Sequence, residues 1–193
     1  MKEQVQAILN AEADAIRSIP VTDAVTKAIE ALRDCRGKVF TTGIGKAGYV
    51  AKKAASTFST TGTPAVFLHP GDAPHGDVGV VQKGDILIAF SNSGHTREVI
   101  ETAHFCRKLG ASLIISIVSR GDTPLGEDSD IVLEIGKIEE PCPLGLTPTA
   151  STTAMIALTD ALALATMSAR GFTKQDFAVR HHGGYLGKVS REE

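Results

Sequence analysis

The stretch DILIAFSNSGHTREVIETAHFCRKLGASLIISIV, residues 85–118, decides the fold of this 193-residue chain. It contains two short, continuous apolar runs at 85–90 and 113–118, which are typical of strands buried on both faces. Residues 95–109 between them have a helical pattern that ends at Gly110. A strand, a helix and a strand in this order predict parallel strands joined by a crossover helix.

The same alternation continues on both sides of this unit. Further strands are expected at 38–43, 65–69 and 130–135, and further helices at 2–17, up to about 35, at 47–60 and at 150–169. This order predicts an α/β fold, a three-layer αβα sandwich around a five-stranded parallel sheet of the flavodoxin or Rossmann-like type. Ligands bind at the carboxyl ends of the strands in such sheets, so site residues are expected in the loops after the strands.

Composition limits the possible functions. The net charge is −2, with 42% hydrophobic and 22% charged residues, as in ordinary globular proteins. Aromatic residues make up 5%, there is no Trp and there is no long basic run, so no nucleic-acid partner is expected. Neither a signal peptide nor a run of about 18 apolar residues is evident, so we expect a cytoplasmic chain without a membrane partner. Cys35, Cys106 and Cys142 are too widely spaced for a disulfide framework.

The loop GIGKAG, Gly43 to Gly48, directly follows a predicted strand and opens a helix. It matches the glycine pattern of dinucleotide sites, but no acidic residue follows the next strand, and no Ser or Thr follows a lysine as in a P-loop. Two readings remain. The glycines serve a tight turn, or they let a sugar phosphate approach the backbone with Lys46 facing it.

The loop SNSGHT, Ser91 to Thr96, follows the strand at 85–90. Hydroxyls and free backbone N–H groups at a helix N-terminus form an anion site. One hydroxyl would suffice for a plain helix cap. Three hydroxyls within six residues favour a phosphate.

Three further loops are rich in polar and stiff residues: HPGDAPHGDVG at 69–79, EEPCPLGLTPTAST at 139–152 and RHHGGYLG at 180–187. The first is a candidate site with two His or a turn-rich connection. The second holds Glu140 rigidly between prolines, or simply connects to the long helix. The third presents an imidazole on an irregular segment, or is a disordered tail.

The motifs GIGKAG, TFSTTGTPAVFLHPGDAPHGDVGVV, FSNSGHTRE, EEPCPLGLTPTASTTA and RHHGGYLG occur in this order. Together they resemble the sugar isomerase (SIS) domain of arabinose-5-phosphate isomerases, from about Gly37 to Gly187. The resemblance implies interconversion of D-arabinose 5-phosphate and D-ribulose 5-phosphate, which supplies Kdo, an acidic sugar of bacterial envelopes and lipopolysaccharide. Long family members carry C-terminal CBS modules. Here we expect a single SIS domain over 1–193, with N-terminal helices over about 1–35 and no CBS modules.

The resemblance also implies roles for particular residues. The substrate and its phosphate are expected at Gly45, Ser91, Asn92, Ser93 and Thr96. The implied catalytic set is Lys46, His75, Glu98, Glu140 and His181. His181 is expected to reach the site of a neighbouring subunit, because these isomerases resemble one another in forming homotetramers. No cofactor is implied.

Isomerisation of an aldose to a ketose needs a base for a carbon-bound proton and a group that stabilises the enediolate. Burial in a proline-walled loop is expected to raise the pKa of Glu140 toward neutrality, where a general base works best. His181 or His75 would open the sugar ring and move protons on oxygen. Lys46 would stabilise the oxyanion or hold the phosphate. Glu98 would hold sugar hydroxyls or orient Lys46.

The chain departs from the family pattern at His95 and at Arg180 to Gly184. No metal is required, but extra imidazoles predict an inhibitory zinc site at His75, Cys142 and His181. Three alternative functions remain. They are an isomerase of another sugar phosphate such as 3-hexulose 6-phosphate, a non-catalytic module that binds a sugar phosphate or nucleotide-sugar, and a dinucleotide oxidoreductase.

Overall fold

The computed structural model describes residues 1–189 and 191. Five parallel strands form one sheet in the order β2-β1-β3-β4-β5. The strands are β1 (Val39–Thr42), β2 (Ala65–Phe67), β3 (Ile86–Phe90), β4 (Leu113–Val118) and β5 (Ile131–Glu134). Each lies within a range predicted from the sequence, and the prediction of an α/β fold with a five-stranded parallel sheet is confirmed.

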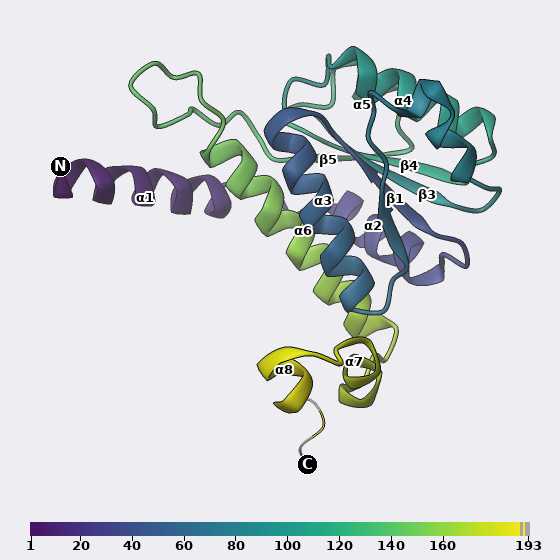
Figure 1. Cartoon of the computed structure of the whole chain (residues 1–193). Coiled ribbons are helices and arrows are strands. Elements are labelled where there is room, and N and C mark those ends of the chain that lie inside the picture. Colours follow the sequence, from purple (N-terminus) through teal and green to yellow (C-terminus); the bar gives the residue numbers. More distant parts are fainter. Residues whose placement is uncertain (190, 192–193) are drawn as a thin grey trace.

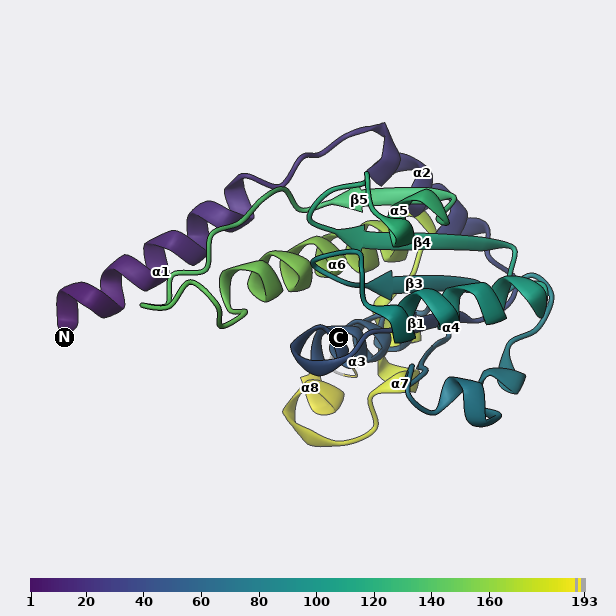
Figure 2. The same cartoon turned by 90° about the horizontal axis from the view of Figure 1, so that it is seen from above.

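Helices cover both faces of the sheet (Figures 1 and 2). One face packs against α2 (Asp23–Asp34), α3 (Gly45–Thr60) and α6 (Ala150–Ala169), and α1 (Lys2–Arg17) packs on α6. The other face packs against α4 (Arg97–Lys108), α5 (Pro124–Glu127) and the 3₁₀ turns η1 (Ala73–His75) and η2 (Asp77–Val80). The chain ends with α7 (Lys174–Arg180) and α8 (Gly184–Val189), beyond the C-terminal end of α6.

The central strands are buried throughout, as their continuous apolar sequences predict. All residues of β1 and β3 are buried, whereas the edge strands β2 and β5 are partly exposed. Successive side chains of β3 alternate between the two cores: Ile86 and Ile88 face the core under α3 and α6, and Leu87 faces the core under α4. The sheet therefore forms the middle layer of the predicted three-layer sandwich.

Helix α6 is the central helix of the first layer. It contacts α1, α2 and α3, which surround it. Within the described part of the chain it is the only helix that is long and apolar enough to cross a membrane, and half of that apolar stretch is buried inside the protein. A core helix of a soluble protein has the same length and composition, and the packing of α6 is that of a core helix.

The structure differs from the predicted ranges at α3, α4 and α8, and α5, α7, η1 and η2 lie where no helix was predicted. α3 begins two residues earlier than predicted, at Gly45, and α4 begins two residues later, at Arg97. The segment predicted to be irregular at 180–187 is helical from Gly184, where α8 begins with a positive φ of 69°. The paired glycines suggested a break in the chain, but glycine accepts this backbone conformation and a short helix follows it.

Candidate functional site

The order of the strands places a crevice between β1 and β3. β1 has β2, the next strand in the chain, on one side and β3 on the other, so the order of the strands reverses direction here. The helices that follow β1 and β3 therefore lie on opposite faces of the sheet. Parallel sheets bind ligands at such a switch point, outside the carboxyl ends of the strands. A pocket of about 310 Å³ lies here. It is lined by Ile44, Lys46, Ala47, Phe90, Ser91, Asn92, Ser93, Thr96, Pro148, Ser151, Thr152 and Met155.

The loop after β3 is held by its own hydroxyls. The Ser91 side chain is buried, and its Oγ lies 2.8 Å from Thr96 Oγ1 and accepts a hydrogen bond from the Gly94 amide at 3.1 Å. Gly94 has a φ of 67°, and a Cβ there would overlap the side chain of Thr123. The loop is therefore closed across Ser91 and Thr96 and requires glycine at position 94.

The N-terminus of α4 is open toward this pocket. Thr96 is the N-cap residue, yet its side chain makes no capping hydrogen bond to the helix, because its hydroxyl pairs with Ser91. A plain Ser or Thr cap was one reading of this loop, and Thr96 at the N-cap position makes no such bond. Unsatisfied amides and the positive end of the helix dipole favour an anion. The pocket contains Ser91, Asn92, Ser93 and Thr96, four residues expected to bind the substrate.

Lys46 lies on the other side of the crevice, in the first turn of α3, and is exposed where it lines the same pocket. The turn before α3 is tight: a Cβ on Gly48 would lie 2.7 Å from the carbonyl oxygen of Gly43. Gly45, also expected to bind the substrate, lines a different cavity on the far side of this turn. The structure thus brings Lys46 to the Ser91–Thr96 loop but not Gly45.

A second cavity, of about 440 Å³, continues from the first into the proline-rich loop before α6. The two cavities share Asn92 and Pro148. Glu139, Glu140 and Leu146 are among the residues that line the second cavity. Glu140 therefore lies beside the hydroxyl-rich pocket, as its place in the predicted site requires.

The Glu140 carboxylate caps the N-terminus of α6. Its Oε2 accepts hydrogen bonds from the amides of Thr149 (2.8 Å) and Ala150 (2.9 Å) and from the Thr149 hydroxyl (3.2 Å). Its Oε1 accepts hydrogen bonds from the amide of Ser151 (3.3 Å) and from the Ser151 hydroxyl. Five donors thus meet a carboxylate that offers about four lone-pair positions.

These contacts correct the prediction made for the pKa of Glu140. Burial does act to raise it, but the hydrogen bonds from the Ser151 hydroxyl and the amides of Thr149, Ser151 and Ala150 outweigh burial and lower the pKa. The predicted rise toward neutrality is wrong, because the loop delivers Glu140 to a helix N-terminus. At neutral pH the carboxylate is ionised.

Cys142 occupies a turn of the same loop. Its Sγ accepts hydrogen bonds from the amides of Leu146 (3.2 Å) and Thr147 (3.3 Å), and these lower the pKa of the thiol to about 7. Sequence analysis considered this cysteine only as a zinc ligand. The thiol instead organises the turn, since its partners are backbone amides four and five residues ahead in the chain.

Three predicted catalytic residues, Glu98, His75 and His181, line neither the pocket at the Ser91–Thr96 loop nor the cavity beside Glu140. Glu98 is exposed in the first turn of α4, and His75 is exposed at the end of η1. His181 follows α7, where its ring stacks on Phe177 at 4.2 Å between centroids. α6 has 20 residues, or about 30 Å, between the Glu140 cap and the segment that carries His181.

The predicted zinc site is not formed within one chain. Among the residues that the structure describes, no group of three or more His, Cys, Asp or Glu side chains could hold a metal ion. His75, Cys142 and His181 lie on η1, the loop before α6 and the segment after α7, which the fold does not bring together.

Sequence analysis missed the contribution of α6 to the pocket. Ser151, Thr152 and Met155 line it from the first turns of that helix. Their signal was present in the motif TPTAST, whose last three residues were assigned both to the loop at 139–152 and to the helix at 150–169. The helix begins at Ala150, so Ser151 and Thr152 present their hydroxyls from its first turn.

The family model of the SIS domain matches residues 31–165, and the chain belongs to the SIS domain family. The arabinose 5-phosphate isomerase KdsD of Pseudomonas aeruginosa is 43% identical over 185 residues, which are 95% of this chain and 56% of that protein. The chain therefore spans about half of the length of the curated relatives that it matches.

Two solved structures are similar over nearly their whole length. A candidate phosphosugar isomerase involved in capsule formation, from Bacteroides fragilis, has a TM-score of 0.92 and 46% identity, and covers 96% of this chain and 99% of that one. An Escherichia coli CFT073 protein, solved in complex with arabinose 5-phosphate, has a TM-score of 0.88 and 36% identity, and covers 92% of this chain and 95% of that one.

Proposed function

We propose that this chain interconverts D-arabinose 5-phosphate and D-ribulose 5-phosphate. The observation that carries the proposal is that the two cavities of the site adjoin each other. An anion pocket at the open N-terminus of α4 shares Asn92 and Pro148 with a second cavity that is lined by an ionised carboxylate. The relatives named above support the choice of substrate, since one is an arabinose 5-phosphate isomerase by name and another was solved with that sugar phosphate bound.

The substrate phosphate binds at the Ser91–Thr96 loop. The open amides of α4 and the hydroxyls of Ser93 and Thr96 supply hydrogen bonds, and Lys46 supplies a positive charge from across the crevice. The net charge of −2 gives no global attraction for an anion, so these local groups must provide the affinity. The sugar then extends from the phosphate toward the cavity lined by Glu139 and Glu140.

The reaction proceeds through a cis-enediol. A base removes the proton from C2 of the open-chain aldose, the electrons of that C–H bond form the C1–C2 double bond, and O1 takes up negative charge. O1 is protonated, the proton of O2 is lost, and C1 receives a proton to give the ketose. Lys46, on the pocket wall, stabilises the oxyanion.

Glu140 acts as the base for the carbon-bound proton. Its contact with Ser151 explains how it reaches the substrate, because Ser151 both lines the phosphate pocket and donates to Glu140 Oε1. When the Ser151 hydroxyl turns to a bound sugar, one lone pair of Oε1 becomes free to accept a proton. Ser151 thus couples the arrival of substrate to the availability of the base.

His181 enters the site of a neighbouring subunit, and the active assembly is a homotetramer. Two features support this. His181 lies about one α6 length away from Glu140 of its own chain. α1 extends beyond the sheet (Figures 1 and 2) and exposes Val5 by 57% and Leu9 by 56%, an apolar surface that a second copy would cover. His75 and Glu98 complete the polar set of the active site in the assembly. The chain acts in the cytoplasm, and its product supplies the biosynthesis of Kdo.

A coupled assay tests the activity. Arabinose 5-phosphate is the expected substrate, and 3-hexulose 6-phosphate and sedoheptulose 7-phosphate are the controls. Turnover of a control in preference to arabinose 5-phosphate would contradict the substrate. Exchange of the C2 proton with deuterated solvent is expected during turnover, and complete retention of the original hydrogen would instead indicate a hydride shift.

A further inference from the structure

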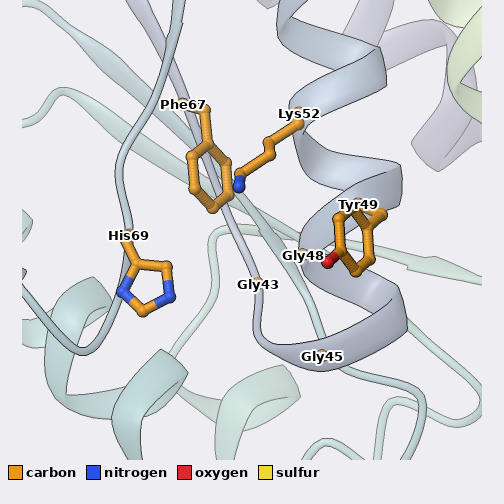
Figure 3. Close-up of a pocket in the computed structure, with 7 residues that line it drawn as sticks. All are labelled: Gly43, Gly45, Gly48, Tyr49, Lys52, Phe67 and His69. Atoms are coloured by element: carbon orange, nitrogen blue, oxygen red, sulfur yellow. The ribbon is translucent and has the colours of Figure 1, made fainter.

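A third cavity lies on the far side of the turn that precedes α3, away from the Ser91–Thr96 loop. Figure 3 shows it between the end of β2 and the first turns of α3. Its volume is about 140 Å³, and it shares no lining residue with the cavities of the proposed active site. Tyr49, Lys52, Phe67 and His69 supply its side chains, and three glycines form the rest of the wall.

Lys52 provides a fixed positive charge. Its Nζ lies 5.5 Å from the centre of the Tyr49 ring and 5.1 Å from the centre of the Phe67 ring, so two aromatic faces hold the ammonium in place. Within the described part of the chain Lys52 forms no ion pair, whereas the adjacent Lys53 pairs with Asp160. The charge of Lys52 is therefore available to a ligand.

His69 presents a second donor. Its Nδ1 accepts a hydrogen bond from the Gly71 amide at 3.2 Å and lies 3.3 Å from Asp72. Because Nδ1 accepts the Gly71 amide hydrogen, the ring carries its own hydrogen on the other nitrogen, Nε2, which can donate. In Figure 3 one ring nitrogen of His69 points toward Gly43 and the interior of the cavity.

Tyr49 contributes the third donor. Its ring is exposed on α3, and Figure 3 shows its hydroxyl turned toward Gly48, into the space that Lys52 and His69 also face. None of the described residues that line the cavity carries a carboxylate. Three side-chain donors, one of them a lysine ammonium, thus surround a small space with an apolar wall at Phe67.

We propose that this cavity is a second anion site that binds the phosphoryl group of a small phosphorylated metabolite. The three donors match the three terminal oxygens of a phosphate monoester, and the small volume admits the phosphoryl group and little more. The carbon chain of the ligand lies against Phe67 or leaves toward solvent. The two anion sites lie on opposite sides of the same turn, Gly43 to Gly48.

Amide NMR of the assembled protein, titrated with inorganic phosphate at constant ionic strength, tests this site. The amides of His69 and Gly71 report on the proposed site, and those of Ser93 and Gly94 report on the active-site pocket. We expect both pairs to shift along saturable curves with separate dissociation constants. Absence of any shift at His69 and Gly71 would overturn the proposal, whatever the result at Ser93 and Gly94 says about the proposed function.

The variant Lys52→Met removes the charge and keeps an apolar stem between the two rings. It is expected to weaken phosphate binding at His69 and Gly71 by roughly tenfold or more and to leave Ser93 and Gly94 unchanged. Lys53→Met removes the same charge from the next position and is expected to change neither curve. Tyr49→Phe, which keeps the ring, is expected to weaken the His69 curve several-fold. Equal effects of Lys52→Met and Lys53→Met would show that general surface charge is responsible and would overturn the site.

Discussion

Glu140 has a proposed role in the reaction and a structural role at the start of α6. The same carboxylate that is proposed to take a proton also satisfies three amides at the start of α6. Its neighbours in the sequence are a second glutamate and a proline, which suggest burial and a raised pKa. No local pattern shows that residues 149–151 fold back as a helix N-terminus around it, and that long-range contact reverses the direction of the pKa shift.

The capping role predicts a pH-dependent effect on stability. Because the folded pKa of Glu140 lies below its ordinary value near 4.5, the ionised group stabilises the fold above that pH, and this contribution is lost as the pH falls through the lower folded pKa. Glu140→Gln is therefore expected to lower the Tm by a few degrees at pH 7. The difference from wild type should shrink below pH 4.5. Thermal unfolding across the acid and neutral range measures it.

Glu139→Gln is the matched control for this prediction. Glu139 is exposed and makes no hydrogen bond within the described part of the chain, so its substitution removes the same charge one position away. We expect its Tm to stay close to that of wild type across the range. An equal loss in both variants, or a loss from Glu140→Gln that persists unchanged at the acid end, would contradict the cap.

The base role predicts the position of a limb in the pH–rate profile. With a lowered pKa, ionisation of Glu140 should limit kcat/KM only below pH 4.5, and a limb at about 6–7 would belong to another group, such as an imidazole or the substrate phosphate. Ser151→Ala removes a hydrogen bond that stabilises the ionised form, so the pKa rises and the acid limb moves to higher pH. Ser168→Ala, at the exposed far end of α6, should leave the profile unchanged. A limb that stays in place in Ser151→Ala would remove Glu140 from the base role.

At the scale of elements, the central strands and long helices could be predicted because their signals are local. Continuous apolar runs give buried strands, and β3 and β4 follow the predicted ranges within one residue. The first residues of α3 and α4 could not be predicted as well. They depend on whether Gly45 and Thr96 belong to the helix or to the preceding loop. The short elements η1, α5 and α8 carry too few residues for any periodic pattern.

The loop between β3 and α4 can be tested as one unit. Gly94 combines a φ of 67° with a neighbour, Thr123, that a Cβ would overlap. Gly94→Ala is expected to lower the free energy of unfolding by about 1–3 kcal/mol and to weaken phosphate binding, because the loop must shift away from the N-terminus of α4. Urea unfolding and a phosphate titration measure the two effects.

Gly79→Ala provides the control for this loop. Gly79 lies in η2, and a Cβ there would meet no other group and would require no positive φ. We expect this variant to unfold and to bind phosphate like wild type. A Gly94→Ala protein with unchanged binding would show that the shape of the loop does not set the affinity.

At the scale of the whole molecule, the long α6 separates two parts of one proposed site. Glu140 caps its first residue, and His181 lies beyond its last, where one buried ring nitrogen, Nδ1, has no hydrogen-bond partner in the described part of the chain. Within one subunit, these two groups lie at opposite ends of a buried core helix. If both act in one reaction with α7 placed as it is here, they come from different copies of the chain.

Mixing two inactive variants tests this arrangement directly. Glu140→Gln and His181→Asn are each expected to lose activity as pure proteins. When they are unfolded together in equal amounts and reassembled, about one quarter of the sites should combine an intact Glu140 from one chain with an intact His181 from another. Activity should then recover to about one quarter of that of wild type treated in the same way. If both residues serve the site of their own chain, every site keeps one defect and the mixture stays as inactive as its components, so the measurement separates the two arrangements without reference to how many subunits assemble.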